Sequence, residues 1–222
     1  MIVTGGSRGI GAATARLAAE RGYAVVVNYV SNADAADDVV GSIEAKGGRA
    51  IAVKGDVGEE CDIRALFEAA DRFGRLGCLV NNAGIVYRAQ TVAEMEFARI
   101  DRMMRVNVTG SILCAREAVR RMARSRGGAG GAIVNISSAA GRLAQPGFAA
   151  YGTAKAALSA LTRLLGQEVP GLGLATTLLI VFVVGALATN VFGKRMLQRG
   201  ESYLLKLPVF RAVYSPVKQL VA

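Results

Sequence analysis

The chain has 222 residues, of which 52% are hydrophobic, with a net charge of +10 and a mean hydropathy of +0.35. This length fits one domain, or one domain with an appendage, and is enough to bury a core. The chain contains no histidine, which excludes His-based catalytic triads and His-ligated metal sites, so we expect no metal. Cys61, Cys78 and Cys114 show no CxxC spacing, which indicates a reducing compartment rather than a disulfide framework. Residues 1–3 lead directly into a glycine-rich turn, so we expect no signal peptide there.

Positive charge is concentrated in arginines on the predicted helices. No aromatic residues interleave with these arginines to stack on bases, so we interpret them as a solvated face and expect no nucleic-acid partner. The arginines are Arg99, Arg102, Arg105, Arg116, Arg120, Arg121 and Arg124.

Short apolar runs alternate with helical stretches along the first 168 residues, which predicts βαβ units and a doubly wound parallel sheet of the α/β class. The predicted strands are residues 2–3, 24–28, 50–57, 78–84 and 132–138. The predicted helices are residues 11–21, 33–46, 62–73, 96–124 and 151–168.

The first strand leads into TGGSRGIG, residues 4–11. Glycines at a strand-to-helix turn let the backbone approach a phosphate, and the helix that follows presents free N–H groups to it. Such a turn is a weak signal alone, but its βαβ context favours a nucleotide site.

Two further motifs carry candidate chemistry. YGTAK places Tyr151 and Lys155 one helical turn apart, where an ammonium lowers the pKa of a phenol and prepares it for proton transfer. Such pairs are also common on solvated helix faces. NISS ends the fifth strand with Ser137 and Ser138 at the carboxyl edge of the sheet, where ligands bind in open α/β folds. Serines there are also common as cap or turn residues.

Six motifs occur in order: TGGSRGIG, GDV, NNAG, VNVTG, NISS and YGTAK. Together they resemble the short-chain dehydrogenase/reductase family over residues 1–168. The resemblance implies an NAD(P)-binding Rossmann-like domain that transfers hydride between a nicotinamide and a small-molecule carbonyl or alcohol. It also implies homo-oligomers and a cytoplasmic site.

The resemblance assigns four catalytic residues. Asn107 anchors a proton-relay water, Ser138 polarises the carbonyl, Tyr151 is the acid/base, and Lys155 binds the nicotinamide ribose and lowers the pKa of Tyr151. The residues implied to bind cofactor are Gly5, Ser7, Arg8, Gly9, Ile10, Gly11, Asn28, Asp56, Val57, Asn82, Ala83, Gly84, Tyr151 and Lys155.

The end of the second strand bears on the cofactor. An acid there would bind a free ribose 2′-OH, whereas a nearby arginine favours a 2′-phosphate. The strand ends in Asn28-Tyr29, the next acid is Asp34, and Arg8 lies in the glycine turn, so we favour NADP(H) over NAD(H).

The resemblance weakens after residue 168, where residues 169–193 carry no charge. One interpretation is a sixth strand, in which VGALATN, residues 184–190, resembles the family's Pro-Gly-x-x-x-Thr turn. A second is a membrane helix over residues 172–192, whose 21 residues span about 31 Å, the thickness of a hydrocarbon core.

Residues 169–222 also resemble a bacterial inner-membrane protein family of unknown function, from the PGLG start to the Tyr-Ser…Val-Lys-Gln tail. We favour the membrane helix because this resemblance accounts for the tail too. A single span then conflicts with topology, because a cytoplasmic nicotinamide site and the basic flank at Lys194 and Arg195 lie on opposite sides of it.

The sequence therefore predicts two parts: residues 1–168, an incomplete NAD(P)-binding domain, and residues 169–222, a hydrophobic helix with a basic tail. We predict an NADP(H)-dependent oxidoreductase, cytoplasmic and, if residues 172–192 span a membrane, anchored to the inner membrane. The alternative is a membrane-anchored fusion or truncated relic that keeps the nucleotide fold with little or no activity.

Overall fold

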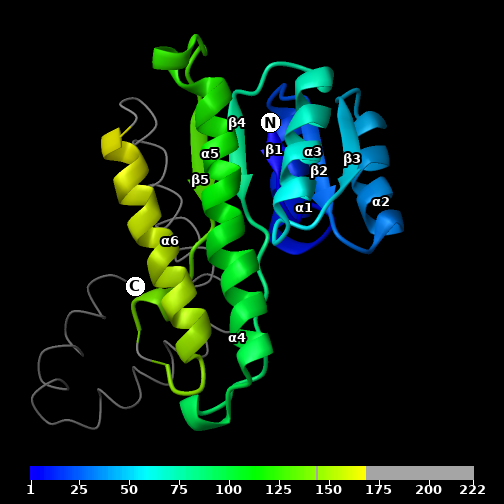
Figure 1. Ribbon diagram of the computed structural model, residues 1–222. Helices are drawn as coiled ribbons and strands as arrows, with labels where there is room; N and C mark the ends of the chain where they lie inside the picture. The colour runs from blue at the N-terminus through cyan, green and yellow to red at the C-terminus, as the bar shows by residue number, and fades with distance from the viewer. Residues whose placement is uncertain (144, 169–222) are drawn as a thin grey trace, which may run out of the picture. The chain divides into compact units, whose positions relative to one another are not determined.

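The computed structural model describes residues 1–143 and 145–168. Five parallel strands form one sheet in the order β3-β2-β1-β4-β5 (Figure 1). The strands are β1 (Ile2–Val3), β2 (Val25–Tyr29), β3 (Ala50–Lys54), β4 (Cys78–Asn81) and β5 (Ala132–Asn135). The predicted doubly wound α/β class is confirmed.

Helices cover both faces of this sheet. In Figure 1, α3 and α5 lie in front of it with α6 beside α5, whereas α1 and α2 pack together on the other face. The α-helices are α1 (Gly9–Glu20), α2 (Ala33–Glu44), α3 (Glu60–Phe73), α4 (Phe97–Met104), α5 (Gly110–Met122) and α6 (Ala149–Glu168). The shorter helical turns are η1 (Val92–Glu94), η2 (Arg105–Thr109), η3 (Arg124–Arg126) and η4 (Ala139–Gly141).

The strands are short, apolar and covered on both faces. Val25, Val26 and Val27 of β2 are all buried, as expected for a parallel strand with helices on either side. Phe67 of α3 and Leu79 of β4 are fully buried in the main core cluster. This packing fixes the carboxyl ends of the strands, where the candidate site lies.

Three predicted strands end earlier than expected, and the fifth ends at Asn135 rather than residue 138, where Ser138 already begins the η4 turn. The third ends at Lys54 rather than residue 57, because the chain then turns away and the backbone N–H of Asp56 donates to Asp62 Oδ2. The fourth ends at Asn81 rather than residue 84, because the N–H groups of Asn82 and Ala83 donate to the Thr4 hydroxyl instead of continuing the ladder.

The prediction of one uninterrupted α-helix over residues 96–124 is wrong, because the α-helix is interrupted. A π-helical turn, Arg105–Thr109, separates α4 from α5. Gly110 follows this turn and lies directly against the backbone of Val57, where a side chain would not fit. The wider turn lets the chain pass under the loop after β3 and brings Asn107 to the site.

Several of the predicted surface arginines are paired rather than merely solvated. Glu117 is buried on α5, and its carboxylate lies 2.8–3.2 Å from Arg116, Arg120 and Arg121. Burial acts to raise the pKa of Glu117, but its bonds to these arginines outweigh it and the pKa is lowered. Arg121 also bonds Asp71 of α3 at 2.8 Å, so the network joins α3 to α5.

We expect the substitution Gly11→Ala to destabilise the fold. A Cβ at Gly11 would overlap the Gly5 carbonyl oxygen and approach Asn82 Nδ2 to 2.5 Å, so the free energy of unfolding should fall by about 1–3 kcal/mol. Gly41→Ala is the control: it lies exposed on α2 with no atom within 4 Å of the added carbon, and should raise stability by about 0.5–1 kcal/mol. Urea unfolding measures both, and equal effects would contradict this prediction.

Candidate active site

The turn after β1 is shaped by glycine and held by its neighbours. Gly5 and Gly9 have φ values of +60° and +53°, a region that side chains disfavour. The side-chain amide of Asn82 donates to the carbonyls of Thr4 and Gly5 at 2.9 and 3.0 Å. On the other side, Gly5 N–H donates to Asn28 Oδ1 at 3.2 Å. The turn is therefore fixed from β4 and β2 together.

The helix α1 begins at this turn with its first N–H groups free of side-chain caps. Arg8 is the N-cap residue but makes no capping hydrogen bond, and the first turn of α1 contains no acidic residue. Free N–H groups and the positive end of the helix dipole form an anion-binding site. The exposed Arg8 side chain adds a full positive charge to it.

A cleft of about 350 Å³ opens at the carboxyl ends of the strands, where helices leave β1 and β4 on opposite faces. This is where open α/β sheets bind ligands, and the volume is typical of a small-molecule site. The predicted residues that line it are Gly5, Ser7, Arg8, Gly9, Ile10, Asn28, Asp56, Val57, Asn82, Ala83 and Gly84. Gly11 lies beneath the turn instead, and Tyr151 and Lys155 lie outside the cleft lining.

The sequence prediction missed several cleft residues. Tyr29, Val30, Ser31 and Asn32 extend the wall beyond the end of β2, and Ile85 and Val106 extend it toward η2. Their position directly after a predicted strand was the only available signal. Arg102 of α4 is the largest omission: it forms an ion pair with Asp56, whose Oδ1 also accepts from Gly58 N–H at 2.8 Å.

Three predicted residues, Gly84, Asn107 and Lys155, meet at the edge of the cleft. A Cβ on Gly84 would lie 3.3 Å from Asn107 Oδ1 and 3.5 Å from Lys155 Nζ, so no side chain separates these groups. Asn107 is fully buried in η2, and its amide group both accepts from and donates to the backbone of Ile85 at 2.8 Å. The loop after β4, η2 and α6 therefore meet at Gly84.

Lys155 is buried, with only 5% of its surface exposed. Its ammonium donates to the carbonyl of Ile136 at 2.8 Å and lies 5.8 Å from the centre of the Tyr151 ring. Burial lowers the pKa of Lys155 to about 8. Ser137 Oγ donates to the Lys155 carbonyl at 3.0 Å, so the end of β5 holds both ends of this residue.

Two glycines let the η4 turn, which Ser138 begins, pack closely against α6. A Cβ on Gly141 would lie 2.8 Å from the backbone of Lys155, and one on Gly152 would lie 2.8 Å from the carbonyl of Ala140. Ser138 begins the η4 turn and accepts from Ala140 N–H at 3.2 Å. Sequence reasoning missed both glycines, which let η4 pack backbone to backbone on the helix that carries Tyr151.

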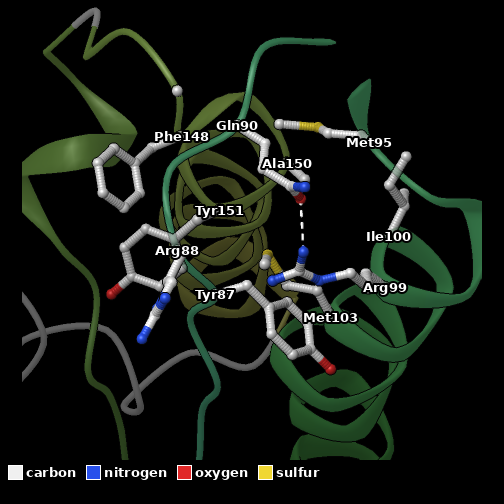
Figure 2. Close-up of a pocket in the computed structure, with 11 residues that line it drawn as sticks. Tyr87, Arg88, Gln90, Met95, Arg99, Ile100, Met103, Phe148, Ala150 and Tyr151 are labelled. Atoms are coloured by element: carbon white, nitrogen blue, oxygen red, sulfur yellow. Dashed lines mark hydrogen bonds between the residues drawn. The ribbon is translucent and has the colours of Figure 1, made fainter. Parts of the chain in front are cut away.

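Tyr151 faces a second, smaller pocket, shown in Figure 2. Its walls come from the loop after β4, from α4 and from the start of α6. Aromatic and apolar side chains dominate it, together with Arg88 and Arg99. Tyr151 therefore lines this pocket, while Lys155, whose ammonium lies 5.8 Å from the centre of the Tyr151 ring, lies beside Gly84 in the lining of the cleft.

Residues 1–197 match the family described as short chain dehydrogenase. The chain belongs to this short-chain dehydrogenase/reductase family of oxidoreductases.

The relatives agree with this assignment. An uncharacterized oxidoreductase, YgfF, from Escherichia coli is 48% identical over 175 residues, covering 78% of this chain and 71% of the relative. A dehydrogenase/reductase from Sinorhizobium meliloti has a TM-score of 0.71 at 37% identity, covering 78% of this chain and 67% of the other. A short chain dehydrogenase from Burkholderia cenocepacia, solved in complex with NADP, has a TM-score of 0.67 at 38% identity, covering 77% and 69%.

The second resemblance is confirmed as well. Residues 175–222 match a family described as protein of unknown function DUF502. The two matches overlap over residues 175–197, so the predicted division after residue 168 stays a prediction. Within residues 1–143 and 145–168, no helix combines the length and apolar character needed to cross a membrane. The predicted sixth strand or membrane helix lies outside the described residues.

We expect Lys155 to make stability depend on pH. Its pKa is about 8 in the fold and 10.5 when unperturbed, so between these values only the unfolded chain holds the proton. The free energy of unfolding should therefore rise with pH across this window, by at most about 3 kcal/mol, and be flat below it.

Lys155→Met isolates this contribution, because other titrating groups cancel when the variant is subtracted from the parent chain. Chemical unfolding at a series of pH values measures the difference. Parallel stability curves for the two proteins between pH 8 and 10.5 would contradict the lowered pKa of Lys155.

Proposed function

We propose that the chain interconverts a carbonyl and an alcohol with NADP(H), using Tyr151 as the acid/base. One observation carries this proposal: the buried Lys155 ammonium lies 5.8 Å from the Tyr151 ring centre and beside Gly84, which lines the nucleotide cleft. The pair thus links the cleft to the pocket that Tyr151 faces.

Each side chain then has a distinct task. When bound, the nicotinamide supplies or accepts the hydride at the carbonyl carbon. In the direction of reduction Tyr151 gives its hydroxyl proton to the carbonyl oxygen, and in oxidation it takes the proton from the alcohol. Ser138 donates a hydrogen bond to the same oxygen. Lys155 binds the nicotinamide ribose, and Asn107 holds a relay water at η2.

The cleft fits NADP(H) better than NAD(H). No acidic side chain stands among the five cleft residues that run from Asn28 to Asn32, so no carboxylate there accepts from a ribose 2′-OH or repels a 2′-phosphate. Arg8 and Ser31 line the same cleft and can bind a phosphate. The Burkholderia relative in complex with NADP supports this preference.

The alternative, an inactive membrane-anchored relic, is less well supported. The family match continues to residue 197, Asn107 and Lys155 both lie beside Gly84, and the Lys155 ammonium lies 5.8 Å from the Tyr151 ring centre. Homo-oligomers through α5 and α6 and anchoring through residues 172–192 stay predictions. An inactive relic would turn over no aldehyde or ketone with NADPH, and turnover by the parental chain in the assay below tests that.

We expect Tyr151→Phe to lower turnover by about 10²–10⁴-fold while leaving NADPH binding intact, because only the transferable proton is lost. Oxidation of NADPH with a panel of aldehydes measures turnover, and NADPH fluorescence measures binding. Tyr23→Phe, on an exposed tyrosine before β2, is the control and should keep parental activity. Parental turnover in Tyr151→Phe would refute the assigned role.

We expect Arg8→Ala to weaken NADPH binding by about ten- to a hundredfold through loss of a charge-assisted hydrogen bond, with a much smaller effect on NADH. Arg21→Ala, at the opposite end of α1, is the matched control and should change neither. Dissociation constants from fluorescence titration give both ratios. An equal loss for the two cofactors would remove Arg8 from 2′-phosphate recognition.

A further inference from the structure

The pocket that Tyr151 faces is lined by positively charged side chains and by no negatively charged ones. Its lining contains two arginines, Arg88 and Arg99, and no aspartate or glutamate. The remaining wall is mostly aromatic or apolar, with Tyr87, Phe148 and Met95 among its residues. Positive charge against low-polarity walls attracts anions more strongly than the same charge in open water.

Arg99 keeps its charge uncompensated. Its guanidinium donates to Gln90 Oε1 at 2.7 Å and lies 4.6 Å from the centre of the Tyr87 ring, and both partners are neutral (Figure 2). These contacts hold Arg99 in place without cancelling its field.

Three acids close to Arg99 in sequence lie outside the pocket lining. Glu94 closes a capping box with Thr91 at 2.8 Å, and Asp101 pairs with Arg105 at 3.0 Å. Glu96, the N-cap residue of α4, is exposed.

Arg88 is the pocket arginine that is available to bind a ligand. It is exposed, and within the described part of the chain no carboxylate lies within 4.0 Å of its guanidinium. Arg88 and Tyr151 line the same pocket, and in Figure 2 their polar ends point to the same side of it. A ligand whose oxygen meets the phenol can present a second group to this arginine.

We propose that this pocket selects substrates in which the reacting carbonyl or alcohol is joined by an aromatic or apolar body to a carboxylate, with Arg88 binding the carboxylate. The pocket has a volume of only about 20 Å³, so the body lies across its mouth, against Phe148 and Tyr87. Arg99 adds to the positive potential and Arg88 supplies the hydrogen bonds. This inference rests on the proposed function for its reaction, but its binding step does not require turnover.

A matched pair of aldehydes tests the inference: para-carboxybenzaldehyde and its methyl ester, which share the ring and the reacting group and differ in charge. Isothermal titration of the whole chain with each compound measures binding without any reaction. We expect the carboxylate to bind about tenfold or more tightly than the ester, a ratio that falls as salt is raised. Equal affinities for the two compounds would overturn the inference.

Arg88→Gln should abolish the preference, and Arg88→Lys should keep part of it, because lysine retains charge without the planar fork. Arg163→Gln is the matched control, exposed on α6 twelve residues beyond Tyr151, or about 18 Å along the helix. It should leave the ratio unchanged. Circular dichroism and NADPH affinity confirm that each variant is folded. A carboxylate preference that survives in Arg88→Gln would also overturn the inference.

Failure of the proposed function gives a different result. An active-site role for Tyr151 is refuted by turnover that persists in Tyr151→Phe, whatever the titrations give. The carboxylate site is refuted by the titrations alone, whatever the turnover. The turnover assay and the titrations therefore test the proposed function and the carboxylate site independently of each other.

Discussion

The hydrogen bonds that hold the glycine turn after β1 are the constraint on which the candidate site depends. Glycines cannot fix their own conformation, so the turn takes its shape from Thr4, Asn28 and Asn82. The Thr4 hydroxyl accepts from two N–H groups of the loop after β4, and Asn82 returns two bonds to the turn. Asn28 is buried, and its Nδ2 donates to Gly55 at 2.8 Å. Asn28 therefore shapes the cleft by joining the turn after β1 to the loop after β3, which leaves its amide few bonds for a ligand.

A second constraint sets the chemistry at the far end of the cleft. The helix α6 carries Tyr151 and Lys155, and its position depends on Gly141 and Gly152, whose missing side chains allow η4 to pack against its backbone. The Lys155 ammonium then has one strong partner, the carbonyl of Ile136, which is a poor substitute for water. This burial explains the lowered pKa of Lys155.

The sequence predicted what is local and missed what is long-range. Strand-helix alternation and the order of the motifs were enough to place the glycine turn, NNAG and YGTAK at one edge of a parallel sheet. The π-helical turn at Arg105–Thr109 was not predicted, because its extra residue only shifts the phase of the helical pattern between α4 and α5. The pair Arg102–Asp56 spans 46 residues, and only the fold brings it together. The early end of β3 has the same origin, since Asp56 N–H bonds a side chain on α3.

Arginines that look alike in the sequence have different partners in the fold. Arg116, Arg120 and Arg121 surround Glu117 within α5, and two of these arginines also pair with Glu60 and Asp71 of α3. Arg8 and Arg88 are exposed, and no carboxylate within the described residues lies within 4.0 Å of either. One lines the nucleotide cleft and the other the pocket beside Tyr151. An arginine without an acid partner leaves a positive field, and here the two fields flank the residues proposed to move the proton. Selection of a phosphate at one end and a carboxylate at the other would follow from the same physical cause.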